Sequence, residues 1–151
     1  MKLFRIAHPE FEAPFNGDGA RLHGGRWNPK GVPLLYYAST LALAALEKRA
    51  HTPAAALGRL WRVIEIEVPD DKVATTASAT LPANWREHPA PDATKEVGQQ
   101  WAASLRSLAL RVPSVIVPSE FNVLVNPVHP HLRLASHVRT DDFRFDERLA
   151  L

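Results

Sequence analysis

Short runs of apolar residues, spaced along the whole chain, predict strands. Leu3–Ala7 has strand character, and Val32–Ala38 is apolar on both faces, as expected of a buried strand. Between Leu60 and Val68, isoleucine and valine alternate with glutamate, which predicts a strand with one solvated face. Four more runs have strand character: Leu110–Val117, Phe121–Val125, Leu132–Val138 and Phe143–Phe145.

Helical periodicity is found in two segments. The first extends from Leu41 to about Ala50 and follows Ser39 and Thr40, either of which can cap a helix. The second is Ala93–Leu108, in which apolar residues recur every three or four positions. Its apolar stripe consists of Val97, Trp101, Leu105 and Leu108.

Two further segments show neither period. Glu10–Lys30 is rich in glycine, asparagine and aspartate, and Pro69–Pro91 is rich in turn-forming residues, so both are predicted to be irregular. A long irregular segment inside a compact domain is often functional. Because short strands outnumber the two helices, the pattern predicts an α+β fold with a mixed sheet and a few helices, as a single domain over residues 1–151.

Composition excludes several classes of site. A chain of 151 residues with 46% hydrophobic residues can bury its own core. It contains no cysteine, which excludes disulfides, thiolate nucleophiles and cysteine-based metal sites, and a cytoplasmic location is expected. No apolar run reaches the length of a bilayer span, so no membrane partner is expected. The 18 basic and 16 acidic side chains are scattered, so no direct contact with nucleic acid is expected.

The glycine-rich segment contains the best candidate for chemistry, because common phosphate-binding loops, zinc-protease motifs and serine-hydrolase motifs are missing from the sequence. Arg26 follows Gly24 and Gly25, and glycine lets an arginine fork approach phosphate oxygens closely. Tyr36 can stack on an aromatic ring, and Glu47 can oppose a developing cation. These features suit a nucleotide whose glycosidic bond is to be broken.

Four sequence blocks, in this order and spacing, resemble the RES domain family over about Phe4 to His129. They are Gly24-Gly25-Arg26-Trp27-Asn28-Pro29-Lys30-Gly31, Pro33-Leu34-Leu35-Tyr36, Leu41-Ala42-Leu43-Ala44-Ala45-Leu46-Glu47 with His51, and Val112-Pro113-Ser114 followed by Glu120 to Pro130. The resemblance implies an ADP-ribosyltransferase-like fold, consumption of NAD as substrate with no separate cofactor, and a partnership with an Xre-type antitoxin. The family's name residues, an arginine, a glutamate and a serine, correspond to Arg26, Glu47 and Ser114.

The expected roles follow from the chemistry of nicotinamide release. Nicotinamide leaves ribose through an oxocarbenium-like transition state, which a carboxylate such as Glu47 stabilises more than the ground state. Arg26 is expected to hold the diphosphate or the nicotinamide ribose, Tyr36 to pack the nicotinamide ring, and Ser114 to supply one orienting hydrogen bond. Tyr37 is the alternative candidate for packing the nicotinamide ring. The predicted substrate-binding set also contains Trp27, Asn28, His51 and Asn122.

Some assignments have alternatives. Ser119 competes with Ser114, and Asn122 either hydrogen-bonds backbone at a strand end or touches substrate. His129, His131 and His137 lack helical spacing and a nearby acidic ligand, so no metal site is predicted.

The acceptor of the ADP-ribosyl group is open at this stage. With water or phosphate the protein is an NAD glycohydrolase or phosphorylase. With a macromolecular acceptor it is a mono-ADP-ribosyltransferase. A non-enzymatic module that binds nucleic acid or protein is a third hypothesis, motivated by the small excess of basic over acidic side chains.

Overall fold

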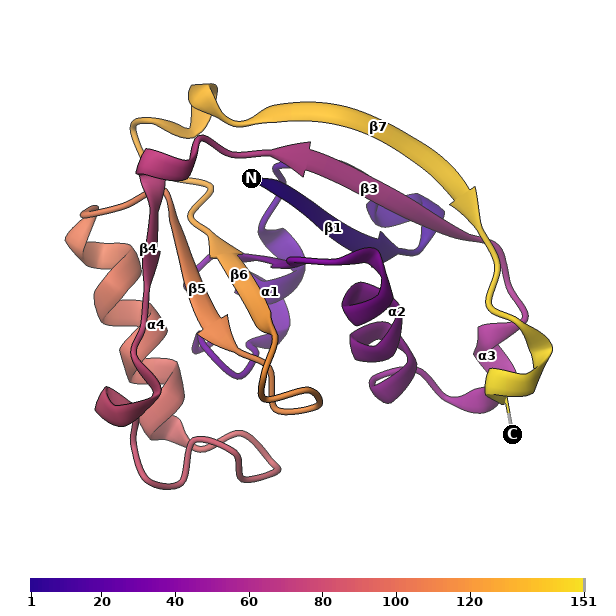
Figure 1. The fold of residues 1–151 in the computed structure, drawn as a ribbon, viewed down its shortest axis with the longest axis horizontal. Coiled ribbons are helices and arrows are strands. Elements are labelled where there is room, and N and C mark those ends of the chain that lie inside the picture. Colours follow the sequence, from indigo (N-terminus) through magenta and orange to yellow (C-terminus); the bar gives the residue numbers. More distant parts are fainter. Residues whose placement is uncertain (151) are drawn as a thin grey trace.

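Seven strands form one mixed sheet in the computed structural model, which describes residues 1–150 (Figure 1). Their order across the sheet is β4-β5-β6-β2-β1-β3-β7. Only β4 and β5 are parallel within this part of the chain, and the other neighbours pair antiparallel. The strands are β1 (Lys2–Ala7), β2 (Leu35–Ala38), β3 (Trp61–Glu67), β4 (Val73–Thr75), β5 (Ala109–Pro113), β6 (Phe121–Val125) and β7 (Ser136–Phe143).

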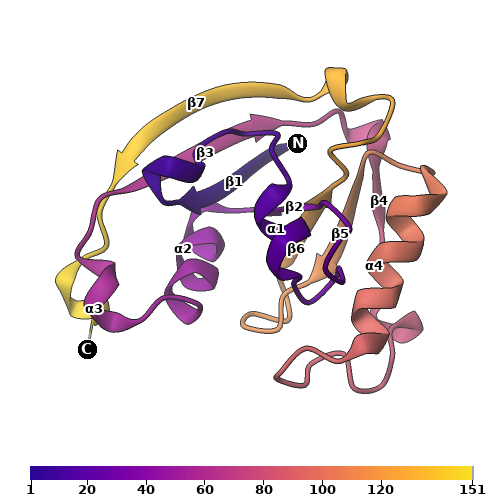
Figure 2. The same ribbon diagram turned by 180° about the vertical axis from the view of Figure 1, so that it is seen from behind.

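Four α-helices accompany the sheet in residues 1–150. They are α1 (Asp18–His23), α2 (Leu41–Ala50), α3 (Ala54–Leu57) and α4 (Asp92–Ser104), with short 3-10 turns at Pro9–Phe11, Asp70–Lys72, Ser78–Thr80, Leu132–Leu134 and Glu147–Ala150. Viewed from behind, α1 lies over β2 and β6, while α4 runs alongside β4 and β5 (Figure 2). No helix in these residues has the length and hydropathy needed to cross a membrane.

Helix α2 begins where the sequence predicts it. Thr40 has an extended backbone, and its hydroxyl accepts a hydrogen bond from the Leu43 backbone N–H at 3.1 Å. Leu43 and Ala44 then face the sheet and pack against Ile6. Since α2 follows β2 directly, this packing fixes the helix against the end of the central strands.

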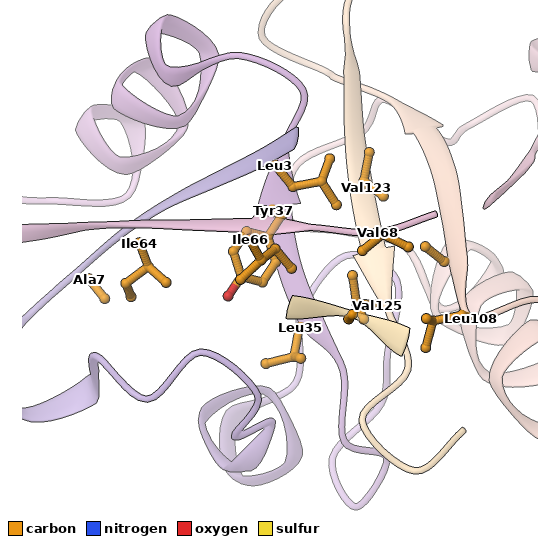
Figure 3. Close-up of a cluster of buried hydrophobic side chains, with 12 residues drawn as sticks. Leu3, Ala7, Leu35, Tyr37, Ile64, Ile66, Val68, Leu108, Val123 and Val125 are labelled. Atoms are coloured by element: carbon orange, nitrogen blue, oxygen red, sulfur yellow. The ribbon is translucent and has the colours of Figure 1, made fainter. Parts of the chain in front are cut away.

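Apolar side chains from the central strands fill the main core. Leu3, Ile64, Ile66, Val123 and Val125 are all buried in one cluster (Figure 3). A second cluster lies under α2, and a third joins β5, β6 and α4. The third cluster also contains the buried side chain of Trp27, so the glycine-rich segment is anchored in the core.

The fold class is as predicted, and several local expectations are wrong. Glu10–Lys30 is not wholly irregular, since α1 forms within it. Pro69–Pro91 contains β4, a three-residue strand whose pairing with β5 depends on contacts distant in sequence. The strand predicted from Val32 begins only at Leu35. The helix predicted to reach Leu108 ends at Ser104, because Leu105 adopts a left-handed conformation with φ of 53°.

The C-terminal strands also differ from the prediction. Leu132–Leu134 is a 3-10 turn, and one strand, β7, replaces the two that were predicted. Because β7 pairs beside β3, the glutamates of β3 are not all solvated: Glu65 is 3% exposed. Its carboxylate pairs with Arg139 Nε at 2.6 Å and Lys2 Nζ at 3.4 Å, and the hydrogen bond from Arg139 lowers the pKa of Glu65.

Candidate functional site

A tight turn presents Arg26 after α1. The turn closes through a hydrogen bond from the Gly25 backbone N–H to the Asn28 carbonyl at 3.0 Å. Gly24 has a φ of 71°, which favours glycine, and a Cβ on Gly25 would lie 2.6 Å from the Tyr36 hydroxyl. The two glycines therefore let the turn close directly against β2.

The Arg26 side chain is held by a loop far away in sequence. Its Nη1 donates to the carbonyls of Trp85 and Glu87, both at 2.8 Å. These bonds engage both hydrogens of Nη1, so the edge formed by Nε and Nη2 is the part of the guanidinium left for a ligand. Burial lowers the pKa of Arg26 and the nearby Glu47 carboxylate raises it. Arg26 and Glu47, 21 positions apart in the sequence, thus lie close enough for their charges to interact.

Tyr36 ties the turn to the sheet. Its hydroxyl donates to Asn28 Oδ1 at 2.6 Å and accepts from the Trp27 backbone N–H at 3.0 Å. Burial raises the pKa of Tyr36 well above its usual range, so the phenol is neutral. Tyr37, the alternative to Tyr36, is buried and its hydroxyl donates to the Pro14 carbonyl at 2.7 Å.

The structure places the side chains of Trp27 and Asn28 inside the protein. Trp27 is 2% exposed, and the Asn28 amide donates to the carbonyls of Ala20, Pro29 and Val32. Both residues shape the turn that carries Arg26.

Glu47 lies on α2 with one carboxylate oxygen bound by two donors. Its Oε1 accepts from Ser114 Oγ at 2.8 Å and from Asn122 Nδ2 at 2.6 Å. The Ser114 oxygen in turn accepts from the backbone N–H groups of Ile116 and Val117, both at 3.1 Å. Because these two bonds occupy the lone pairs of Ser114, its hydroxyl proton points at Glu47.

The remaining predicted residues lie as follows. His51 is exposed just after α2, with its Nδ1–H donating to the Glu47 backbone carbonyl at 2.8 Å. Ser119, the competitor of Ser114, is exposed in the turn between β5 and β6. His129 makes structural contacts: its Nε2 lies 3.0 Å from the Leu105 carbonyl, and its Nδ1 accepts from the His131 backbone N–H. No group of three or more metal-ligating side chains comes together in residues 1–150.

A cavity of about 440 Å³ adjoins Arg26. Its wall contains the basic side chains of Arg26, Lys30 and Lys95 and the imidazoles of His23, His51 and His88. Asp92 is the only acidic residue in its wall, and Lys95 lies 3.6 Å from that carboxylate. The cavity therefore favours an anionic ligand. Arg26 connects it to Glu47, which is not part of the wall.

Sequence reasoning missed the residues that support Arg26 from outside the glycine-rich segment. The carbonyls of Trp85 and Glu87 have no sequence signal, because any residue supplies a backbone carbonyl. Gly98 does have a sequence signal, because glycine is unusual inside an amphipathic helix. A Cβ at Gly98 would lie 1.7 Å from the Trp27 carbonyl oxygen, so only glycine lets α4 approach the Arg26 turn this closely.

The chain is similar to several known proteins. Toxin Res of Yersinia enterocolitica is 38% identical over 151 residues and 99% of each chain. The Prs ADP-ribosylating toxin of a Sphingobium species is 42% identical over 137 residues, covering 89% of this chain and 85% of the relative. In the crystal structure of the M. tuberculosis MbcT–MbcA toxin–antitoxin complex, one chain shares this fold, with a TM-score of 0.77 and 21% identity over 99% of this chain and 86% of that chain. A family model described as the RES domain matches residues 2–146, and this chain therefore belongs to the RES domain family.

Proposed function

We propose that this protein is the toxin of a toxin–antitoxin pair and that it degrades NAD by cleaving the nicotinamide–ribose bond. The observation that carries the proposal is the Glu47 carboxylate, which Ser114 and Asn122 hold through one oxygen and whose charge interacts with the Arg26 guanidinium. NAD is the substrate in this proposal, and the chemistry requires no cofactor. Since cellular NAD is its target, the toxin acts in the cytoplasm.

Glu47 supplies the rate enhancement. As nicotinamide departs, positive charge develops on the ribose, and a fixed carboxylate stabilises that charge more than it stabilises neutral ribose. Ser114 and Asn122 hold Glu47 before the substrate arrives, so little reorganisation is needed during the reaction.

Arg26 supplies the anion site. The Nε and Nη2 edge of its guanidinium can bind two phosphate oxygens as a fork, because Nη1 is already held by the carbonyls of Trp85 and Glu87. The adjoining cavity, with Lys30 and Lys95 in its wall, extends this positive region for the diphosphate of NAD. Tyr36, neutral and fixed against Asn28, is the residue that packs the nicotinamide ring in this proposal.

A second candidate function is mono-ADP-ribosylation of a macromolecule. It is favoured by the 42% identity to the relative named Prs ADP-ribosylating toxin. The first half of the reaction is the same in both cases, and only the acceptor of the ADP-ribosyl group differs.

The proposed partner is an Xre-type antitoxin. The structural neighbour was solved as a toxin–antitoxin complex, and relatives of 34% and 38% identity are named Toxin Res. Binding of the antitoxin is expected to suppress the reaction.

Incubation of the purified protein with NAD tests the proposal. Nicotinamide release in buffer supports a glycohydrolase, release that requires added phosphate supports a phosphorylase, and transfer of label from adenylate-labelled NAD to a protein in a bacterial lysate supports the transferase. A Glu47→Gln sample of equal folded concentration controls for contaminating NAD-degrading enzymes. Absence of all three products with the wild-type protein contradicts the enzymatic function and favours a binding module.

A further inference from the structure

Asn122 lies at the point where three elements meet. It is the second residue of β6, in register with Val112 of β5 on one side and Ala38 of β2 on the other. Its side chain is half-buried, and its Nδ2 donates to Glu47 Oε1 on α2 at 2.6 Å. The amide therefore connects the central sheet to the helix that carries the carboxylate.

Two donors converge on the same oxygen of Glu47. Ser114 Oγ, just after β5, and Asn122 Nδ2, on the neighbouring β6, both bond Oε1. Hydrogen bonds to the charged form of a carboxylate favour that form and restrict its rotation. Oε2 is then the oxygen that can face a developing positive charge.

The two donors are chemically different. The Ser114 hydroxyl can donate or accept, and it donates here because two backbone N–H groups occupy its lone pairs. The Nδ2 group of Asn122 can only donate. Asn122 is thus a permanent donor to Glu47 Oε1.

We propose that Asn122 is a positioning residue that fixes the Glu47 carboxylate, and that it does not contact the substrate. This inference rests on the proposed function for its kinetic consequence, although the geometry itself can be tested without any activity. It assigns the reacting oxygen of Glu47 as Oε2.

Three roles for Asn122 give different results on substitution. A positioning role lowers kcat and leaves KM almost unchanged, because the substrate keeps its own contacts. A substrate contact raises KM. A purely structural role at the strand end lowers thermal stability and affects activity only through the folded fraction.

The kinetic test uses Asn122→Ala and Asn122→Asp, with Glu120→Gln as the matched control. Glu120 lies in the turn that leads into β6, and its Oε2 accepts a hydrogen bond from Thr40 at 3.3 Å instead of contacting Glu47. We expect Asn122→Ala to lower kcat for NAD loss roughly 10- to 100-fold with KM within about threefold. The control should behave as wild type.

Asn122→Asp gives a readout that a structural role cannot mimic. It places a second carboxylate beside Glu47, and two adjacent carboxylates retain a proton to higher pH than one. Arg26 interacts electrostatically with Glu47 and His51 bonds its backbone carbonyl, and both residues are unchanged in the variant. The acid limb of kcat against pH should therefore move up by about one to two pH units in Asn122→Asp and not in Asn122→Ala.

A second measurement decides the geometry independently of the reaction. The side-chain amide resonances of Asn122, assigned in ¹⁵N-labelled protein, should shift markedly in Glu47→Gln and remain in place in Glu120→Gln. If they do not respond to Glu47→Gln, or if Asn122→Ala raises KM without lowering kcat, the proposal is overturned. A clear amide response in a protein that does not consume NAD supports the Asn122–Glu47 contact and contradicts only the proposed reaction.

Discussion

Ser114 donates its hydroxyl proton to the Glu47 carboxylate at 2.8 Å, although the two residues are 67 positions apart in the chain. Ser114 is fully buried at the end of β5, while Glu47 is half-buried in the last turns of α2. The sheet order places β6 between β5 and β2, and α2 follows β2, so the fold itself brings the serine to the glutamate.

The first prediction concerns the charge of Glu47. Glu47→Gln keeps the size of the side chain and removes the charge that stabilises the oxocarbenium-like transition state. We expect the rate of NAD loss to fall by roughly 10²-fold or more, while the affinity for NAD changes little. Nicotinamide release and calorimetric titration with NAD measure the two effects. Near-normal turnover in a folded variant removes Glu47 from the mechanism.

The second prediction concerns the geometry of Arg26. Arg26→Lys keeps the positive charge, but an ammonium cannot bond the carbonyls of Trp85 and Glu87 while presenting a planar fork to phosphate. We expect NAD affinity to fall by at least about tenfold, corresponding to about 1.4 kcal/mol. Calorimetry with NAD checks this, and equal affinities for the two proteins contradict bidentate binding of phosphate by Arg26.

The local sequence was sufficient for elements whose stability is local. Helix α2 has the predicted bounds Leu41–Ala50 because Thr40 caps it and its apolar spacing matches the sheet surface, and β6 has the predicted bounds Phe121–Val125. Glu65 shows the limit of this approach. Its alternation with isoleucine suggests that Glu65 is solvated. In the structure, β7, which is distant in sequence, pairs with β3 and supplies Arg139 as the partner of Glu65.

In the candidate site, too, some residues could be predicted from the sequence and others depend on contacts distant in sequence. The resemblance to the RES family predicted Arg26, Glu47 and Ser114; in the structure Ser114 hydrogen-bonds Glu47, and the charges of Arg26 and Glu47 interact. It gave no information on the loop that holds Arg26, because the contacts come from backbone carbonyls of Trp85 and Glu87, which any side chain at those positions would supply.

The third prediction concerns the close approach of α4 to the Arg26 turn. Gly98→Ala places a methyl group against the Trp27 carbonyl, so α4 and the turn must separate. We expect a loss of about 1–3 kcal/mol in the free energy of unfolding together with weaker NAD binding. Gly19→Ala in α1 is the matched control, because a Cβ there meets nothing within 4 Å. Denaturant titrations that give both variants equal stability contradict the tight contact.

The fourth prediction concerns the pH dependence of stability. The pKa of Glu65 is lower in the folded protein than in the unfolded chain, mainly through Arg139, so its stabilising effect is complete above its unfolded value near 4 and is lost as pH falls. Glu65→Gln should destabilise the protein by about 1–2 kcal/mol at pH 7. The difference should shrink below about pH 4. Thermal unfolding of both proteins from pH 7 to pH 3 tests this, and a pH-independent difference argues against the ion pair.

The last prediction concerns toxicity. If the protein drains NAD, expression of the wild type alone in a bacterium should arrest growth as cellular NAD falls, and expression with its antitoxin should restore growth. Glu47→Gln should be tolerated without the antitoxin, because a carboxamide at this half-buried helix position preserves the shape of the side chain. The comparison must be made at matched soluble yield, since a destabilised variant is also harmless. Glu120→Gln, which leaves the Glu47 contacts intact, should remain as toxic as the wild type. Growth arrest that persists undiminished in folded Glu47→Gln, with NAD unchanged, shows that toxicity comes from a binding activity and contradicts the enzymatic proposal.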